Sequence, residues 1–169
     1  MAIVHQPLDF IGINLYTRVI VRHDANEPNL NARDVGPSGD VERTNFGWEV
    51  CPEAIYDVIM RIWNDYKTPI YVTENGASYP DVPNADRTVD DPGRVSFLRR
   101  YIGQVGRAIE DGADVRGYQL WSLMDNFEWG MGYTQRFGIV YVDYETQERI
   151  IKHSGRWYRQ VISDNAVEV

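Results

Sequence analysis

The segment TPIYVTENG, residues 68–76, decides how the rest of the sequence is interpreted. Its apolar run at residues 70–72 predicts a short buried strand, which ends at the carboxylate of Glu74. Asn75 and Gly76 follow, and an Asn-Gly pair is typical of a sharp turn. A carboxylate at such a position can simply cap the turn, so its surroundings must decide between a structural and a chemical role.

Two long amphipathic helices are predicted on either side of this strand. They cover residues 52–66 and 92–111, each begins at a proline, and Gly112 suits the end of the second. Apolar residues repeat every three or four positions in both. These residues are Ile55, Val58, Ile59, Ile62 and Tyr66 in the first helix, and Val95, Leu98, Ile102, Val105 and Ile109 in the second.

Strands alternate with helices along the whole chain. Strands are predicted near residues 9–16, 70–74 and 117–122, and a last short helix near 154–163. Residues 138–144 also look extended, whereas residues 24–47, 77–90 and 124–138 have the composition of loops. The alternation predicts an α/β fold with parallel strands, forming a single domain over residues 1–169.

The predicted strands end on polar or aromatic side chains. These are Asn14 and Tyr16, then Glu74, then Trp121. In a βα barrel the chemistry takes place at the carboxyl ends of the strands, so this common position indicates a site.

Composition excludes several classes of partner. The 169 residues are 43% hydrophobic, and 17 basic against 25 acidic residues give a net charge of −8. Since no run of Lys or Arg is present, neither nucleic acid nor an anionic membrane surface is an expected partner. No apolar run is long enough to cross a bilayer, and residues 1–8 lack the apolar core of a signal peptide. We therefore expect a soluble, cytoplasmic protein.

Cofactor chemistry has little support in the sequence. The single cysteine, Cys51, cannot form an internal disulfide and lacks the spaced partners of a zinc site, so no metal is predicted. A small buried residue is the favoured interpretation of Cys51, and a reactive thiol is the alternative. A nucleotide-binding domain is poorly supported, because no glycine-rich phosphate loop opens a helix after a strand.

Two groups of residues suggest chemistry on a sugar. Tyr16 can donate a hydrogen bond to Glu74, and an oriented, ionised carboxylate is a nucleophile. The loop WSLMDNFEWGMGYTQRFG, residues 121–138, gathers aromatic side chains around a second carboxylate. Aromatic faces pack against pyranose C–H groups, while carboxylates accept hydrogen bonds from hydroxyls. A satellite hydrophobic cluster is the structural alternative for any one of these tryptophans.

The sequence closely resembles the family 1 glycoside hydrolases of the β-glucosidase type. The resemblance is carried, in the right order and over essentially the whole chain, by DFIGINLYTR, GWEVCPEAIYDVI, YVTENGA, VRGYQLWSLMDNFEWGMGYTQRFGIVYVDY and IKHSGRWYRQVI. It implies a partial (β/α)8 TIM barrel containing the C-terminal three βα units. The activity implied is that of a retaining β-glycosidase, which needs no metal or cofactor.

The resemblance also implies a role for each matching residue. Glu74 corresponds to the catalytic nucleophile and Tyr16 to its hydrogen-bond partner. Leu15 departs from a tyrosine common in the strand motif, but its neighbours match. The residues implied in substrate binding are Asn14 beside Tyr16, Trp121 under the glycone sugar, Glu128 and Trp129 on its hydroxyls, Phe137 closing the glycone pocket and Trp48 lining the aglycone side.

One essential part of the family's site has no counterpart here. The general acid/base is the Glu of an Asn-Glu-Pro motif on the fourth strand of the barrel, and the chain covers only the last three units. The sequence does contain NEP at residues 26–28, but in a polar loop, where a coincidence is the favoured interpretation.

Two functional hypotheses therefore remain open. In one, the chain is the C-terminal part of a β-glucosidase acting on terminal β-glucosides when the barrel is complete. In the other it is a non-catalytic barrel fragment or assembly module with weak sugar binding. Three parallel strands would expose two edges and an apolar inner face, so we expect self-association or a complementary N-terminal barrel fragment as partner.

Overall fold

The protein is described by a computed structural model that covers residues 6–28 and 30–168. Its main sheet contains β1 (Ile11–Asn14), β4 (Ile70–Asn75) and β5 (Val115–Leu120), paired in parallel in the order β1-β4-β5. The three predicted strands are thus confirmed, although β1 is shorter than expected. Residues 1–5 of the segment examined for a signal peptide lie outside the described residues.

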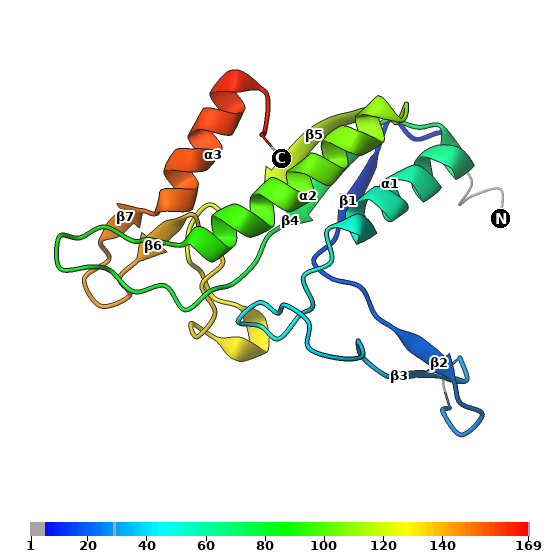
Figure 1. Ribbon diagram of the computed structural model, residues 1–169, viewed down its shortest axis with the longest axis horizontal. Coiled ribbons are helices and arrows are strands. Elements are labelled where there is room, and N and C mark those ends of the chain that lie inside the picture. Colours follow the sequence, from blue (N-terminus) through cyan, green and yellow to red (C-terminus); the bar gives the residue numbers. More distant parts are fainter. Residues whose placement is uncertain (1–5, 29, 169) are drawn as a thin grey trace.

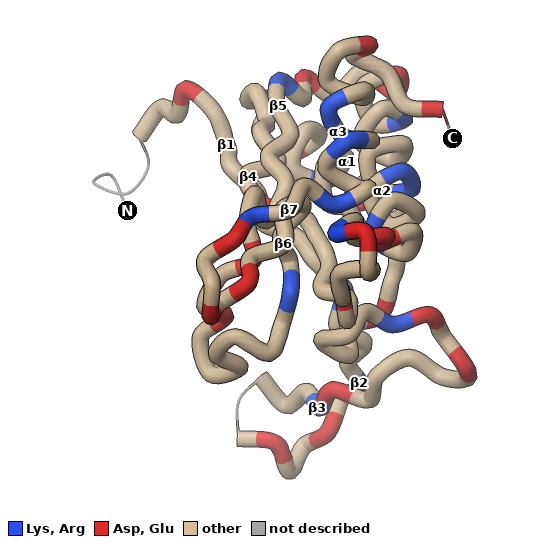
Figure 2. The backbone as a smooth tube through the Cα atoms, turned by 90° about the vertical axis from the view of Figure 1, so that its left-hand side faces the viewer, with Lys and Arg blue, Asp and Glu red and all other residues tan. Residues whose placement is uncertain are grey.

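Three helices lie on one side of this sheet. They are α1 (Glu53–Tyr66), α2 (Pro92–Glu110) and α3 (His153–Asp164), close to the predicted limits. Figure 2 shows β1, β4 and β5 on one side of the molecule and the three helices on the other. The α/β prediction with parallel strands is correct, because each strand of the sheet is followed in sequence by a helix that covers the same face.

The helix ends follow from local chemistry. Pro52 directly precedes α1, and Lys67 directly follows it with a left-handed φ of 52°. Beyond α2, Gly112 has a φ of +95°, which favours glycine because it lacks a Cβ. Two residues of the predicted apolar faces do not join the core: Tyr66 is 65% exposed and Ile109 is 48% exposed. Both lie in the last turn of a helix.

The hydrophobic core lies between the sheet and the helices. Ile70 and Val72 of β4 are fully buried, as are Ile55 and Ile59 of α1. From α2, the core receives Phe97, Leu98, Tyr101, Val105 and Ala108. Burying one aliphatic side chain of this size contributes about 1.5–3 kcal/mol, so this interface is what holds the strands in position.

Two short antiparallel hairpins lie outside the main sheet. β2 (Val21–His23) pairs with β3 (Ala32–Asp34), and β6 (Val140–Val142) pairs with β7 (Arg149–Ile151). Figure 1 shows the β2–β3 hairpin extending away from the sheet. The prediction that residues 24–47 form only loop is therefore wrong, because β3 falls within them. The NEP segment, residues 26–28, lies between β2 and β3.

The face of the sheet opposite the helices is more polar than predicted. Gly12, Asn14, Thr73 and Gln119 are exposed there, and Thr73 donates a 2.6 Å hydrogen bond to the side-chain oxygen of Asn14. The same face also carries apolar surface, where the ring of Phe10 packs edge-on against Tyr71 at 5.2 Å. The expectation of an apolar inner face therefore holds only in part, because polar residues gather toward the carboxyl ends of the strands.

Within the described residues, no helix is long and apolar enough to cross a membrane.

Cys51 is 8% exposed, and burial raises the pKa of its thiol. A buried thiol with a raised pKa is a poor nucleophile, which agrees with the small-buried-residue interpretation.

Candidate active site

The centre of the site is a short hydrogen bond between two strand ends. The Tyr16 hydroxyl donates to Oε2 of Glu74 at 2.6 Å, as the sequence predicted. The backbone N–H of Leu15 also donates to the carbonyl of Glu74 at 3.0 Å, so the main chains run side by side there. Burial, the hydrogen bond and the Glu74 charge all raise the pKa of the Tyr16 phenol well above its ordinary value. Tyr16 therefore stays protonated and remains a donor.

Asn75 holds the backbone around Glu74, a role that sequence reasoning missed. Its fully buried amide donates to the carbonyl of Leu15 at 2.7 Å and accepts from the Tyr118 hydroxyl at 2.5 Å. The backbone carbonyl of Asn75 also accepts a hydrogen bond from the backbone N–H of Trp121 at 2.9 Å. One side chain thus joins all three strands beside Glu74. The available signal was its position in a buried strand, because a buried amide must find partners.

Gly76 is needed for close packing and not for a turn. The sharp turn predicted at Asn75 and Gly76 is absent, and the chain continues from β4 without one. A Cβ at Gly76 would lie 1.7 Å from the carbonyl oxygen of Trp121. Glycine is required because two backbones from different loops meet there, which no local sequence pattern announces.

Aromatic side chains support Tyr16. Its ring lies 5.2 Å from Trp48 and 6.1 Å from Phe137, measured between centroids. Trp48 in turn packs on Phe46 at 4.2 Å. From α2, the Tyr101 hydroxyl donates to the carbonyl of Tyr16 at 3.4 Å. The sequence predicted Trp48 and Phe137 in the site, whereas Phe46 and Tyr101 were missed.

Phe137 is brought to the site but is only 2% exposed. Its ring also lies 6.0 Å from that of Trp48, which places it among the aromatic rings behind Tyr16. So little exposed surface offers a sugar little contact. The predicted role of Phe137 in closing a glycone pocket stays a prediction.

The second carboxylate lies close to the first. Trp121, which directly follows β5, lies beside the carboxyl of Glu128, and the charge of Glu74 acts on the same carboxyl. Burial raises the pKa of Glu128, the neighbouring Trp121 indole N–H lowers it as a donor, and the charge of Glu74 raises it. The structure thus brings Trp121, Glu128, Glu74 and Tyr16 together, although they come from three separate parts of the chain.

The structure places Asn14 and Trp129 at the borders of this group. Asn14 ends β1 and pairs in register with Glu74. Trp129 begins the 3-10 turn η1 (Trp129–Met131), directly after Glu128, and is 82% exposed. The indole of Trp129 is therefore accessible, and its predicted role as a donor to a sugar hydroxyl stays a prediction.

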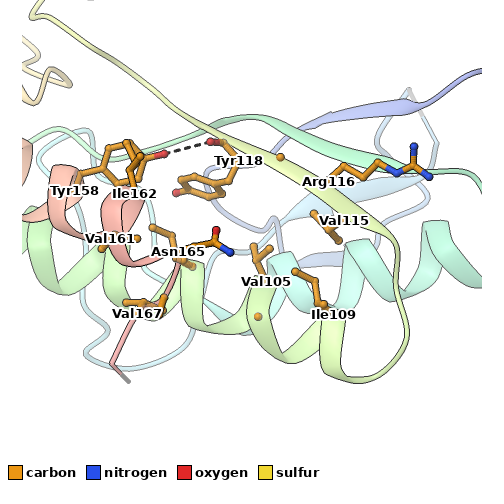
Figure 3. A pocket seen from close by; sticks show the side chains of 14 residues that line it. Val105, Ile109, Val115, Arg116, Tyr118, Tyr158, Val161, Ile162, Asn165 and Val167 are labelled. Carbon is orange, nitrogen blue, oxygen red and sulfur yellow. Dashed lines mark hydrogen bonds between the residues drawn. The ribbon is translucent and has the colours of Figure 1, made fainter.

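A separate hollow lies away from these residues. A groove of about 410 Å³ runs between α2, β5 and α3, on the helix side of the sheet. Figure 3 shows it lined mainly by valine, isoleucine and tyrosine side chains, with Tyr158 donating to the carbonyl of Tyr118 at 3.2 Å. None of the predicted site residues lines this groove, so it is separate from the Glu74 site.

Among the residues that the structure covers, no group of three or more His, Cys, Asp or Glu side chains could hold a metal ion. The Glu74 site itself presents two carboxylates, Glu74 and Glu128, with the Tyr16 hydroxyl and the Trp121 indole as donors beside them.

The fold and the site together define the chain as part of a (β/α)8 barrel. Three parallel βα units place their functional side chains at the carboxyl ends of the strands, as in barrel enzymes. The profile of "Glycosyl hydrolase family 1" matches residues 1–167, and the chain belongs to this family.

Proteins of known name support this assignment. Beta-glucosidase A of Thermotoga maritima is 43% identical over 169 residues, which are 99% of this chain and 37% of that protein. The 1,4-beta-D-glucan glucohydrolase of Thermotoga neapolitana is 46% identical over 165 residues, covering 97% and 36%. The chain thus spans little more than a third of the length of these relatives.

Solved structures agree. A family 1 b-glucosidase from Thermotoga maritima superimposes with a TM-score of 0.92 at 43% identity, covering 96% of this chain and 36% of that one. The same organism's beta-glucosidase in complex with castanospermine has a TM-score of 0.90 over the same shares. The prediction of a partial TIM barrel is confirmed.

Proposed function

We propose that this chain carries the nucleophile part of a retaining β-glycosidase site, which hydrolyses terminal β-D-glucosides when the barrel is complete. The 2.6 Å hydrogen bond from Tyr16 to Glu74 carries the proposal. It directs one carboxylate oxygen and leaves the other available for an anomeric carbon. Glu74 would form a bond to that carbon while the electron pair of the breaking bond leaves with the aglycone oxygen, and water would then release the sugar.

The neighbouring side chains suit a sugar ligand. Glu128 would accept hydrogen bonds from glycone hydroxyls, Trp121 would lie against the ring, and Trp129 would donate to a further hydroxyl. Asn14 would complete this side of the glycone site. Trp48, stacked on Phe46 at 4.2 Å, would form an aromatic surface on the aglycone side.

The proposal requires a second carboxyl about 5–5.5 Å from the nucleophile, acting as acid and then base. Glu27 of the NEP segment is a poor candidate, because its backbone N–H bonds to the carbonyl of Asp24 in the turn between β2 and β3. That hairpin extends away from the sheet (Figure 1). We infer that another polypeptide segment supplies the acid/base carboxyl.

The open edges of the main sheet indicate a protein partner. In the described part of the chain β1 and β5 each pair with only one strand, so each has a free edge of unpaired backbone groups. Such edges favour pairing with another chain. We infer that the protein self-associates or takes up a complementary N-terminal barrel fragment, and a clean monomer by light scattering at high concentration would contradict this.

Charge is consistent with a neutral small-molecule ligand. Figure 2 shows Lys and Arg positions interspersed with Asp and Glu positions along the backbone, without a continuous basic stripe. A polyanion needs such a stripe to release its counterions, so a sugar is the better-supported partner.

The decisive experiment is covalent trapping. An activated 2-fluoro glucoside should label Glu74, and peptide mass spectrometry should locate the adduct. Glu74→Ala should abolish labelling, while Glu27→Ala, the matched control in the NEP segment, should label like the parent chain. An absence of adduct on folded protein would favour the alternative, a non-catalytic fragment with weak sugar binding.

A further inference from the structure

Six charged side chains form a balanced network between the two loops that follow β4 and β5. Three are basic and three acidic, so their charges cancel. Their side chains are at most 2% exposed, except that of Arg136 at 18%. The members are Arg94, Arg136 and Lys152, with Asp81, Asp91 and Asp125.

Lys152 is the bridge between the two loops. Its ammonium group donates to Asp81 at 2.5 Å and to Asp125 at 2.8 Å. Asp81 lies in the loop that begins after Glu74, and Asp125 lies three residues before Glu128. One side chain, fully buried itself, therefore connects the loop of the proposed nucleophile to the loop of the second carboxylate.

Arg94 reinforces the same connection from α2. Its guanidinium donates to the carbonyl of Ala77 at 3.2 Å, directly after Gly76, and to that of Arg136 at 2.7 Å. It also pairs with Asp81 at 2.7 Å and with Asp91, whose carboxylate accepts from the backbone N–H of Ser154 at 2.8 Å. The start of α3 is thereby attached to the same network.

On the other loop, Asp125 uses both carboxylate oxygens. Besides Lys152, it accepts from Arg136 at 2.6 Å and from the backbone N–H of Gly138 at 3.0 Å. A Cβ at Gly138 would lie 2.1 Å from the backbone nitrogen of Asp125, so the main chains are in direct contact. This loop is therefore a closed unit whose position depends on Asp125.

A buried charge that loses its partner is strongly unfavourable, so this network is expected to hold together as a unit. Burial and the charge of Arg94 lower the pKa of the Lys152 ammonium, and Asp125 and Asp81 oppose this effect. Sliding either loop would separate Lys152 from one aspartate and leave a charge uncompensated. The contacts of Lys152 thus couple the two loops to each other, in addition to their few backbone contacts.

We propose that Lys152 is a positioning residue, which fixes the loop of Glu128 relative to the loop of Glu74. Its meaning for activity rests on the function proposed above, but the coupling of the two loops does not. In the folded protein Lys152 touches neither carboxylate of the site directly, and it acts through Asp81 and Asp125.

Hydrogen exchange tests the coupling without any sugar. In Lys152→Met, which keeps the length of the side chain and removes its charge, amides in residues 76–81 and 121–128 should exchange on the order of tenfold faster. Ile59→Ala, in the core of α1, is the matched control for a general loss of stability. At equal global stability, set with denaturant, the control should not accelerate these two segments together. Equal exchange in both variants, or acceleration of one loop only, would overturn the proposal.

Labelling by a 2-fluoro glucoside gives the second readout. A variant that is merely less stable leaves fewer folded molecules and lowers the amount of adduct, whereas misplaced loops lower the rate constant per folded molecule. We expect Lys152→Met to lower that rate constant at least about tenfold, and Ile59→Ala to lower only the amount. If the parent chain is not labelled at all, the proposed function fails while the exchange result still decides the coupling.

A second variant covers the case in which Lys152→Met does not fold. Asp81→Asn keeps the volume and removes one charge that Lys152 and Arg94 share. It should accelerate exchange in both loops in the same way. If Asp81→Asn folds and leaves residues 121–128 as protected as in the parent chain, the two loops are not coupled and the proposal is wrong.

Discussion

The hydroxyl of Tyr16 lies 2.6 Å from Oε2 of Glu74, although 58 residues separate them in sequence. The contact exists because β1 and β4 are parallel neighbours that end at the same edge of the sheet. It converts a carboxylate that could rotate freely into one with a fixed direction, and every functional expectation for this chain depends on it.

We expect Tyr16→Phe to slow covalent labelling of Glu74 by about 10- to 100-fold, because hydrogen bonds to charged groups contribute about 1.5–3 kcal/mol. Stability should change far less, since the ring keeps its contacts with Trp48 and Phe137. Labelling rates and urea unfolding measure the two effects separately. An unchanged labelling rate would show that the hydrogen bond does not orient the nucleophile.

We expect Gly76→Ala to destabilise the fold by about 3 kcal/mol or more, because the new Cβ would collide with the backbone of Trp121. Gly106→Ala is the matched control: no atom lies within 4 Å of its added Cβ, and it lies inside α2. That control should gain about 0.5–1 kcal/mol from helix propensity. Urea denaturation of both variants measures the two changes in stability. A similar change in both variants would refute the packing argument.

We expect Asn75→Ala to cost about 1–3 kcal/mol, because it leaves the Leu15 carbonyl and the Tyr118 hydroxyl without their partner. The double variant with Tyr118→Phe should cost less than the sum of the single ones, by about 1 kcal/mol. A double-mutant cycle in urea measures this coupling. Strict additivity would mean that the Asn75–Tyr118 hydrogen bond contributes nothing.

The raised pKa of Glu128 predicts a pH dependence of stability. A carboxyl whose pKa is higher in the folded state favours the protonated form, so its contribution is present at low pH and is lost as pH rises through the folded pKa. Glu128→Gln should therefore be more stable than the parent at pH 7, by less than about 1 kcal/mol because the group is partly solvated. The two proteins should unfold alike below about pH 4. A difference independent of pH would assign the effect to packing.

Substrate preference tests the missing acid. Loss of general acid catalysis costs about 10²–10⁴-fold when the leaving group is poor. An aryl glucoside with an activated leaving group needs less protonation, so this chain alone should turn it over in preference to a natural disaccharide. Adding the complementary N-terminal barrel fragment should raise disaccharide hydrolysis most. Equal rates on both substrates without that fragment would contradict the assignment of roles.

Several features could be predicted because they depend on local physics. The helix periods of α1 and α2 and the apolar run of β4 are properties of short segments, and the structure has them within a few residues of the predicted limits. The pairing of Tyr16 with Glu74 could also be predicted, since parallel strands bring their carboxyl ends together.

Other features were missed because they depend on which segments meet. The small hairpin β2–β3 has weak strand signals inside a polar segment, and its pairing stabilises it. Gly76 was assigned to a turn, whereas the approach of Trp121 explains it. The partners of Arg94 and Lys152 lie up to 71 residues away, so the charge network has no local signature.

The sequence by itself determined the alternation of strands and helices, because hydrophobic periodicity is encoded within a few neighbouring residues. Its resemblance to the family 1 glycoside hydrolases implied the barrel class and the candidate nucleophile. Only the tertiary structure decided how Glu74 is held: by Tyr16, by the amide of Asn75 and by loops joined through Lys152. The physical reason is that buried polar groups must find partners wherever the folded chain brings them, and those partners are set by the packing of the sheet and its helices and not by proximity in sequence.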